Sequence, residues 1–282
     1  EARYDAATET SVVRYVPRPD RIRFAAELAA NWAALQGTPV EERRVALVMA
    51  NYPNRDGRLG NGVGLDTPAS AFNVLAALRA AGYSVDGLPA DGQALIERLA
   101  EGPTNDLAER AARPGGMRYA IADYREFFAG LPEAVQDAVN ERWGEPETDP
   151  FVAGDEFLLA AFQLGNVVIG LQPARGYNID PASSYHDPDL VPPHGYLAFY
   201  AWLRRDFAAQ AVVHMGKHGN LEWLPGKAVA LSEGCFPEAA LGPLPHLYPF
   251  IVNDPGEGTQ AKRRAQAVII DHLTPPMTRA ES

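Results

Sequence analysis

One apolar run at residues 45–50 constrains the fold of this chain more than any other segment. The run VALVMA shows no alternation of polar and apolar residues, which indicates a strand buried on both faces. A glycine-rich stretch at 54–64 follows, and Thr67-Pro68 then supplies a capping residue and a first-turn proline for a helix that Gly82 closes. This βα unit predicts an α/β fold of mixed strands and helices with long functional loops, arranged as layered parallel-sheet units.

Further helices and strands are predicted along the rest of the chain. Helices are expected at 20–36, where Phe24, Leu28, Trp32 and Leu35 form one apolar stripe, and at 91–100, 132–143, 195–205 and 253 to about 272; strands are expected at 167–171, 211–214 and 248–252. A polar, proline-bearing stretch at 144–155 marks the expected boundary between two α/β regions. The region 1–150 contains the glycine-rich loop, and the region 151–282 contains a His/Glu motif and a basic helix.

Composition excludes several classes of protein. No apolar run approaches the roughly 18 residues of a membrane-spanning helix. A formal charge of −11 disfavours a general nucleic-acid surface or an anionic-membrane surface. Cys235 is the single cysteine, so internal disulfides are excluded and a reducing, cytoplasmic setting is expected. The chain begins at Glu1 with neither an initiator methionine nor a signal peptide, so we expect a piece of a longer protein.

The segment 211–227 holds the best candidates for chemistry. It places His214, His218 and Glu222 directly after an expected strand, and these are predicted to be both catalytic residues and metal ligands. Residues four apart lie about 6 Å apart on a helix but about 13 Å apart on a strand. Because Gly216 and Gly219 disfavour a regular helix, one shared metal ion requires a bend at the glycines. Alternatively, one histidine satisfies a buried backbone group and Glu222 caps a loop.

Other polar motifs carry weaker predictions. The glycine-rich loop lacks the P-loop sequence, although Asp86 keeps a dinucleotide site open, and Gly62 and Gly64 would allow a flat ligand to approach the backbone. The long segment 172–193 contains tyrosines and prolines and is expected to bind a ligand. Asp254 and Glu257 are explained as a helix cap, and the cations at 262–264 as a solvated face or the edge of a cleft.

Long segments of the chain resemble the large subunits of the cobalt and magnesium chelatases. These segments are 51–64, 172–180, 214–227, 253–264 and 273–276. Residues 221–227 and 253–258 are similar to the cobalt branch. The resemblance implies a nitrogen–metal ligase that inserts Co²⁺, as substrate, into the corrin hydrogenobyrinic acid a,c-diamide in oxygen-dependent cobalamin (vitamin B12) biosynthesis. It also implies cytoplasmic ATPase partners of the AAA+ type, CobS and CobT, which hold ATP and Mg²⁺.

The same resemblance implies roles for particular residues. Glu222 matches an acid that is essential in the magnesium branch, and it and His218 lead the candidates for metal handling or proton acceptance, followed by His214. The residues expected to bind the substrate's carboxylates or ring face are Arg175, Tyr177, Tyr185, Lys217, Lys227, Lys262, Arg263 and Arg264, with the backbone at Gly62 and Gly64.

Three alternatives stay open from the sequence. The first is a magnesium chelatase large subunit acting on protoporphyrin IX. The second is a metal-dependent hydrolase in which His214, His218 and Glu222 activate water. The third is a non-catalytic α/β module that binds a nucleotide at residues 57–64.

Overall fold

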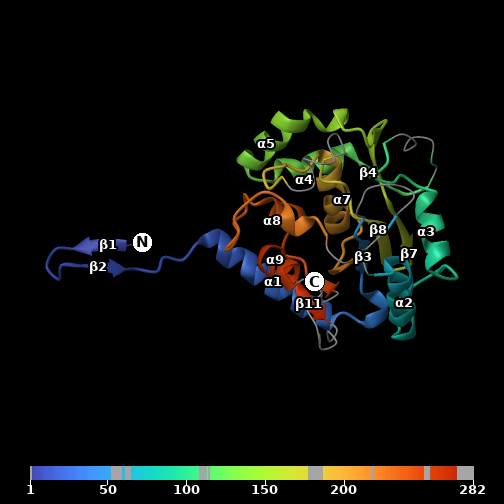
Figure 1. Ribbon diagram of the computed structural model, residues 1–282, viewed down its shortest axis with the longest axis horizontal. Helices are drawn as coiled ribbons and strands as arrows, with labels where there is room; N and C mark the ends of the chain where they lie inside the picture. The colour runs from blue at the N-terminus through green and yellow to red at the C-terminus, as the bar shows by residue number, and fades with distance from the viewer. Residues whose placement is uncertain are drawn as a thin grey trace, which may run out of the picture.

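The centre of the molecule is a six-stranded sheet with the order β11-β10-β9-β3-β8-β7 (Figure 1). The computed structural model describes residues 2–51, 59–60, 65–107, 113, 115–176, 187–216, 219–250 and 255–271. The strands are β3 (Val45–Met49), β7 (Ala161–Leu164), β8 (Val167–Leu171), β9 (Ala211–Met215), β10 (His246–Phe250) and β11 (Val268–Asp271). Neighbouring strands run parallel except for the antiparallel pair β7 and β8.

The order of the parallel strands locates the place where such a sheet binds ligands. Starting from β3, the chain adds β8 on one side and then β9, β10 and β11 on the other. The direction in which the chain adds strands to the sheet therefore reverses at β3, as it does in doubly wound α/β sheets. Ligands of such sheets bind in the crevice beyond the carboxyl ends of the strands at this switch point. The predicted α/β class with parallel units is confirmed. The ligand site is expected beyond the carboxyl ends of β3 and β9.

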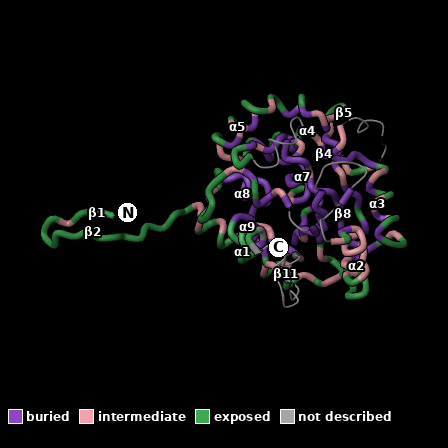
Figure 2. Tube along the Cα trace, in the orientation of Figure 1, coloured by how far each residue is buried: buried purple, intermediate pink, exposed green. Residues whose placement is uncertain are grey.

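Two hydrophobic layers cover the faces of the sheet. Val45, Leu47 and Met49 of β3 pack with α2 (Thr67–Ala80) and α3 (Gly92–Ala100), whereas Ala46 and Val48 pack with α7 (His194–Arg205) and α8 (Phe236–Leu241). Figure 2 shows β3, β8 and α7 as part of the buried interior. The absence of alternation in residues 45–50 follows from this double burial.

Smaller elements complete the layer that contains α7. They are α4 (Ile121–Ala129), α5 (Glu133–Trp143) and a three-stranded sheet of β4 (Met117–Ala120), β5 (Val152–Ala153) and β6 (Glu156–Leu159). Tyr124 and Phe157 pack edge to face in this layer, with ring centroids 4.9 Å apart. None of the described helices combines the length and apolar character needed to cross a bilayer.

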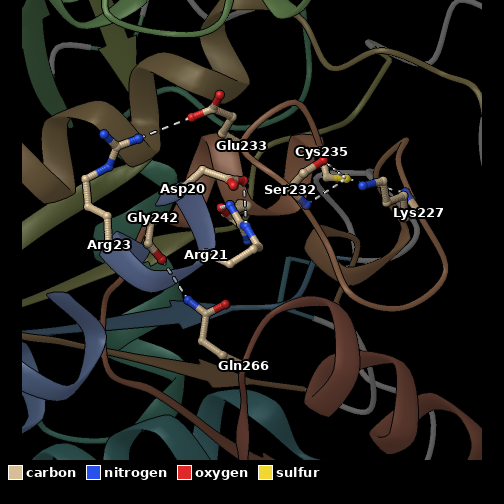
Figure 3. Close-up of polar contacts among 10 residues, drawn as sticks. Asp20, Arg21, Arg23, Lys227, Ser232, Glu233, Cys235, Gly242 and Gln266 are labelled. Carbon is tan, nitrogen blue, oxygen red and sulfur yellow. Dashed lines mark hydrogen bonds and ion pairs between the residues drawn. The ribbon is translucent and has the colours of Figure 1, made fainter. Parts of the chain in front are cut away.

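The N-terminal part reaches away from this body (Figure 1). An exposed hairpin of β1 (Ala2–Asp5) and β2 (Thr10–Val13) precedes α1 (Pro19–Gly37), in which no residue is fully buried. Polar contacts help to join α1 to the body: Arg21 donates to both Glu238 carboxylate oxygens at 2.7 and 2.5 Å, and Arg23 lies 3.4 Å from Glu233 (Figure 3). The predicted stripe from Phe24 to Leu35 is half-buried on this helix.

Two sequence predictions of local structure were wrong. The helix expected to run to about residue 272 is α9 (Pro255–Arg264), after which the chain turns through Gln266 at φ 41° into β11. The β-branched Val268, Ile269 and Ile270 then pair with β10, so sheet formation ends the helix. The cap of α2 is Asp66 instead of Thr67, because the Asp66 carboxylate accepts from the amide of Ala69 at 3.0 Å.

The division into 1–150 and 151–282 stays a prediction. The structure adds that β3 from the first region lies between β8 and β9 from the second, with hydrogen-bonded register on both sides. The site at the switch point therefore combines both regions.

Candidate functional site

The carboxyl ends of β3, β8 and β9 meet at the switch point. The amide of Ala50 donates to the carbonyl of Met215 at 2.7 Å, and the amide of Gln172 donates to the carbonyl of Met49 at 2.8 Å. Gly216 passes so close to β3 that a Cβ at this position would lie 2.3 Å from the Cβ of Ala50. A side chain cannot fit there, so glycine is required for the chain to turn from β9 across the end of β3.

Glu222 is buried beyond this strand end, in the 3₁₀ turn η5 (Leu221–Trp223). Only 1% of the residue is exposed, and its Oε1 accepts from the hydroxyl of Tyr248 at 3.0 Å and from the amide of Gly219 at 3.2 Å. A Cβ on Gly219 would lie 3.0 Å from Gln172 Oε1 and 3.3 Å from Glu222 Oε2, so the loop is packed tightly here. The fold thus places a carboxylate, held by neutral donors, at the expected ligand site.

Two buried arginines hold the backbone of this turn. Arg264 of α9 donates to the carbonyls of Glu222 at 2.7 Å, Leu224 at 2.7 Å and Lys227 at 3.0 Å. Arg175 donates to the carbonyl of Trp223 at 3.1 Å and also to the carbonyl of Asp187. Burial lowers the pKa of both guanidinium groups. The turn that presents Glu222 is therefore fixed from two directions.

A chain of hydrogen bonds starts at His214 in β9. Its Nδ1 lies 2.7 Å from Nε2 of His246, whose Nδ1 lies 2.7 Å from the carbonyl oxygen of Ala265. On the other side, Nε2 of His214 lies 3.0 Å from the hydroxyl of Tyr200. Burial lowers the pKa of His214 well below its usual range, with a further contribution from His246, and burial lowers the pKa of His246 to about 4. Both imidazoles are therefore neutral near pH 7.

The buried His246 predicts a loss of stability in mild acid. An unfolded histidine takes up a proton as the pH falls through about 6.5, but the folded His246 resists protonation until about pH 4. The unfolded state thus binds more protons in this window, and we expect His246 to account for about 2 kcal/mol of the unfolding free energy lost between pH 7 and pH 5. Urea unfolding of wild type and His246→Gln at both values measures this difference. Equal pH dependence in the two proteins would contradict the prediction.

The structure brings two of the predicted catalytic residues to one place. Tyr248 connects them, because its hydroxyl donates to Glu222 and its ring centroid lies 6.0 Å from that of His214. Among the described residues no group of three or more His, Cys, Asp or Glu side chains is arranged to hold a metal ion. His218 lies outside the described residues, so the metal set of His214, His218 and Glu222 stays a prediction.

The predicted binding residues fall into three groups. Lys227, Lys262 and Arg263 are exposed, whereas Arg175 and Arg264 are buried and donate to backbone carbonyls. Gly62, Gly64, Tyr177, Tyr185 and Lys217, like Asp254, lie outside the described residues. Asp86 is beside Gly165, where a Cβ would lie 2.8 Å from its carboxylate, and Gly165 precedes the amino end of β8. Asp86 therefore lies near the amino ends of the strands, whereas Glu222 lies beyond their carboxyl ends. The argument that Asp86 would bind the ribose of a dinucleotide is thereby removed.

Comparison with known proteins identifies the family. The model of the CobN/magnesium chelatase family matches residues 1–282. The chain belongs to this family. It is 64% identical over 280 residues to the aerobic cobaltochelatase subunit CobN of a Sinorhizobium species, covering 99% of this chain and 22% of that protein. It is 35% identical over 264 residues to a magnesium-chelatase subunit of Rhodobacter capsulatus, covering 94% of this chain and 22% of that protein.

A solved structure of the chelatase family confirms the fold. The catalytic subunit of cobaltochelatase from Mycobacterium tuberculosis matches with a TM-score of 0.83 and 47% identity, covering all of this chain and 24% of that one. The family resemblance predicted from the segments around 51–64, 214–227 and 253–264 is therefore confirmed. The chain spans about a fifth of the curated CobN relatives' length.

Sequence reasoning missed four polar residues of this candidate site: Gln172, Tyr200, His246 and Tyr248. Gln172 directly follows β8, and Tyr248 lies in β10. Tyr200 lies in α7, whereas for Gln172, His246 and Tyr248 the signal was a polar side chain at the end of, or within, an otherwise apolar strand. That signal becomes specific only when the strand order places these residues next to His214 and Glu222.

Proposed function

We propose that this chain forms the metal-insertion site of a cobaltochelatase large subunit, with Glu222 as the group that accepts a proton from a ring nitrogen. Inserting a divalent ion into a corrin-type ring replaces N–H bonds with metal–nitrogen bonds, so a base must take each released proton. The observation that carries the proposal is the buried Glu222 carboxylate, held by Tyr248 and Gly219 at the switch point. A carboxylate fixed there meets a ligand in the crevice.

The finer assignments are supported by likeness to the relatives. Identity is 64% to the cobalt subunit and 35% to the magnesium subunit named above, which favours Co²⁺ as the inserted ion. We extend this to hydrogenobyrinic acid a,c-diamide as substrate, and to a cytoplasmic complex in which AAA+ partners of the CobS and CobT type hold Mg²⁺ and hydrolyse ATP. Magnesium insertion into protoporphyrin IX and metal-dependent hydrolysis are the alternatives that the experiment must separate.

Binding roles follow the side chains that are free to meet a ligand. The exposed cations Lys227, Lys262 and Arg263 suit peripheral carboxylates of the macrocycle. Arg175 and Arg264 are proposed to hold the Glu222 turn in place, since their described hydrogen bonds go to backbone carbonyls. The roles proposed for Gly62, Gly64, Tyr177, Tyr185, Lys217 and His218 continue to rest on resemblance.

Reconstitution tests the proposal directly. The protein that carries this chain is combined with its two ATPase partners, and the absorbance of corrin and porphyrin substrates is followed with Co²⁺ or Mg²⁺. We expect ATP-dependent insertion of cobalt into hydrogenobyrinic acid a,c-diamide. Magnesium insertion into protoporphyrin IX without cobalt insertion would overturn the metal and substrate assignment. Zinc-dependent hydrolytic turnover would instead support the hydrolase.

A further inference from the structure

The hydrogen bonds around His214 determine where each proton lies. The carbonyl of Ala265 can only accept, so Nδ1 of His246 carries the proton and donates. In a neutral ring Nε2 of His246 is then an acceptor, which requires Nδ1 of His214 to donate across the 2.7 Å contact. Nε2 of His214 is left as an acceptor for the hydroxyl of Tyr200. One backbone carbonyl thus fixes the tautomers of both histidines.

The same alternation of donors and acceptors continues from Tyr200 to the turn that carries Glu222. Because the Tyr200 hydroxyl gives its proton to His214, its oxygen accepts from Nε2 of Gln172 at 3.1 Å. Oε1 of Gln172 then accepts from the amide of Asn220 at 2.9 Å. The Asn220 side chain is bound too, accepting from the Tyr196 hydroxyl at 2.7 Å and donating to the Pro173 carbonyl at 3.0 Å. Asn220 is the residue that precedes η5.

This arrangement excludes two roles for His214 while it is intact. One end of the chain is a carbonyl and the other is a backbone amide, so no proton can leave at either end and the chain does not relay protons. Both ring nitrogens of His214 are engaged, so it has no lone pair left for a metal ion. Its remaining effect is on the position of Asn220 and of the turn that follows.

We propose that His214, Tyr200 and His246 are positioning residues that order the Glu222 turn through Gln172 and Asn220, and that His214 is not a ligand of the inserted metal. This proposal deepens the proposed function and rests on it for the role of Glu222. The hydrogen-bond chain itself can be tested without any assay of metal insertion.

The chain offers a matched control in the layer containing α7. Tyr124 and His194 form a second buried tyrosine–histidine pair, 2.8 Å apart, and Nε2 of His194 lies 2.8 Å from the carbonyl of Gly144. Here the carbonyl faces Nε2, so His194 must carry its proton on Nε2 and accept from Tyr124 at Nδ1. The two pairs therefore predict opposite tautomers, and the described hydrogen bonds of the control pair do not reach the Glu222 turn.

Nuclear magnetic resonance of the chain with ¹⁵N-labelled histidine tests the first part. The sequence has 6 histidines, which single substitutions can assign. We expect His214 and His246 to be protonated at Nδ1 and His194 at Nε2, with the His214 signals unchanged when Zn²⁺ is added as a diamagnetic probe. A proton on Nε2 of His214, or a zinc-dependent shift of its ring nitrogens, would overturn the proposal even if metal insertion is never detected.

Kinetics of the reconstituted chelatase test the second part. Tyr200→Phe keeps the ring but removes the link between His214 and Gln172, so we expect kcat for cobalt insertion to fall about tenfold with KM for the corrin unchanged. Tyr124→Phe removes an equivalent buried hydroxyl and is expected to leave kcat unchanged. An equal fall in kcat in both variants would mean that removing any buried hydroxyl slows the enzyme by destabilising it. That result would overturn the positioning role. If the wild-type enzyme inserts no metal, the proposed function fails. The tautomers measured by nuclear magnetic resonance then still test whether the hydrogen-bond chain exists.

Discussion

Glu222→Gln is expected to lower the rate of metal insertion roughly 100- to 10,000-fold, the usual contribution of a positioned general base. Glutamine has nearly the same shape, and its carbonyl oxygen can still accept from Tyr248 and Gly219, which hold the carboxylate at 3.0 and 3.2 Å. The substitution therefore removes the negative charge and the proton acceptor while the turn is retained. The reconstituted enzyme, assayed by the absorbance change of the corrin on cobalt binding, gives the rate.

A carboxylate elsewhere in the chain provides the control for charge. Glu233 is exposed and lies 3.4 Å from Arg23, in the contact between α1 and the body, so Glu233→Gln is expected to leave the rate unchanged. Corrin binding by both variants should resemble that of wild type, because the proposed loss is in proton transfer. Full activity in Glu222→Gln would exclude Glu222 as the base, and weaker corrin binding with normal kcat would assign it to substrate binding.

The apolar pattern was sufficient to predict the main layers of this fold. Residues 45–50, 167–171 and 211–214 were predicted as strands and form β3, β8 and β9. Apart from His214, the residues of these strands are apolar or glycine on both faces, and this pattern arises when helices cover the two sides of a parallel sheet. The short strands β4, β5 and β6 of the small antiparallel sheet were not predicted, nor was the edge strand β7, since their local sequence does not distinguish short antiparallel strands from loops.

Much of the site was not predictable because it depends on strand order. Glu222 and His214 were identified from their closeness in sequence, but Tyr248 reaches Glu222 only because β10 pairs with β9. Likewise, Gln172 reaches Asn220 because β8 pairs with β3. A sequence pattern indicates which strands are buried but does not say which strands are neighbours.

The three successive cations of α9 also show what the sequence does not predict, namely the direction in which each side chain points. Lys262, Arg263 and Arg264 were expected to bind carboxylates, and the sequence left open whether they form a solvated face or the edge of a cleft. The helix turns Lys262 and Arg263 to solvent and directs Arg264 beneath the Glu222 turn. Its partners are backbone carbonyls, which have no signature in the sequence.

Arg264→Gln is expected to lower the free energy of unfolding by about 3 kcal/mol, because it leaves buried carbonyls without their charged donor. The guanidinium of Arg264 serves the carbonyls of Glu222, Leu224 and Lys227 at 2.7, 2.7 and 3.0 Å. A lysine in its place is expected to recover little of this stability, since one ammonium group cannot reproduce a planar fork that reaches three carbonyls. Urea unfolding followed by circular dichroism measures both variants.

Arg263→Gln provides the matched comparison for Arg264→Gln. Arg263 is the preceding residue of α9 and is exposed, so its replacement should change the unfolding free energy by less than about 0.5 kcal/mol. The difference between the two variants then isolates the buried hydrogen bonds from the loss of one positive charge on the helix. If the two proteins unfold at the same urea concentration, the carbonyls of the Glu222 turn are satisfied without Arg264 and the arginine does not hold the turn. If Arg264→Gln alone is destabilised, metal insertion measured well below its unfolding transition should still be slower than wild type, because the turn that presents Glu222 has lost its support from α9.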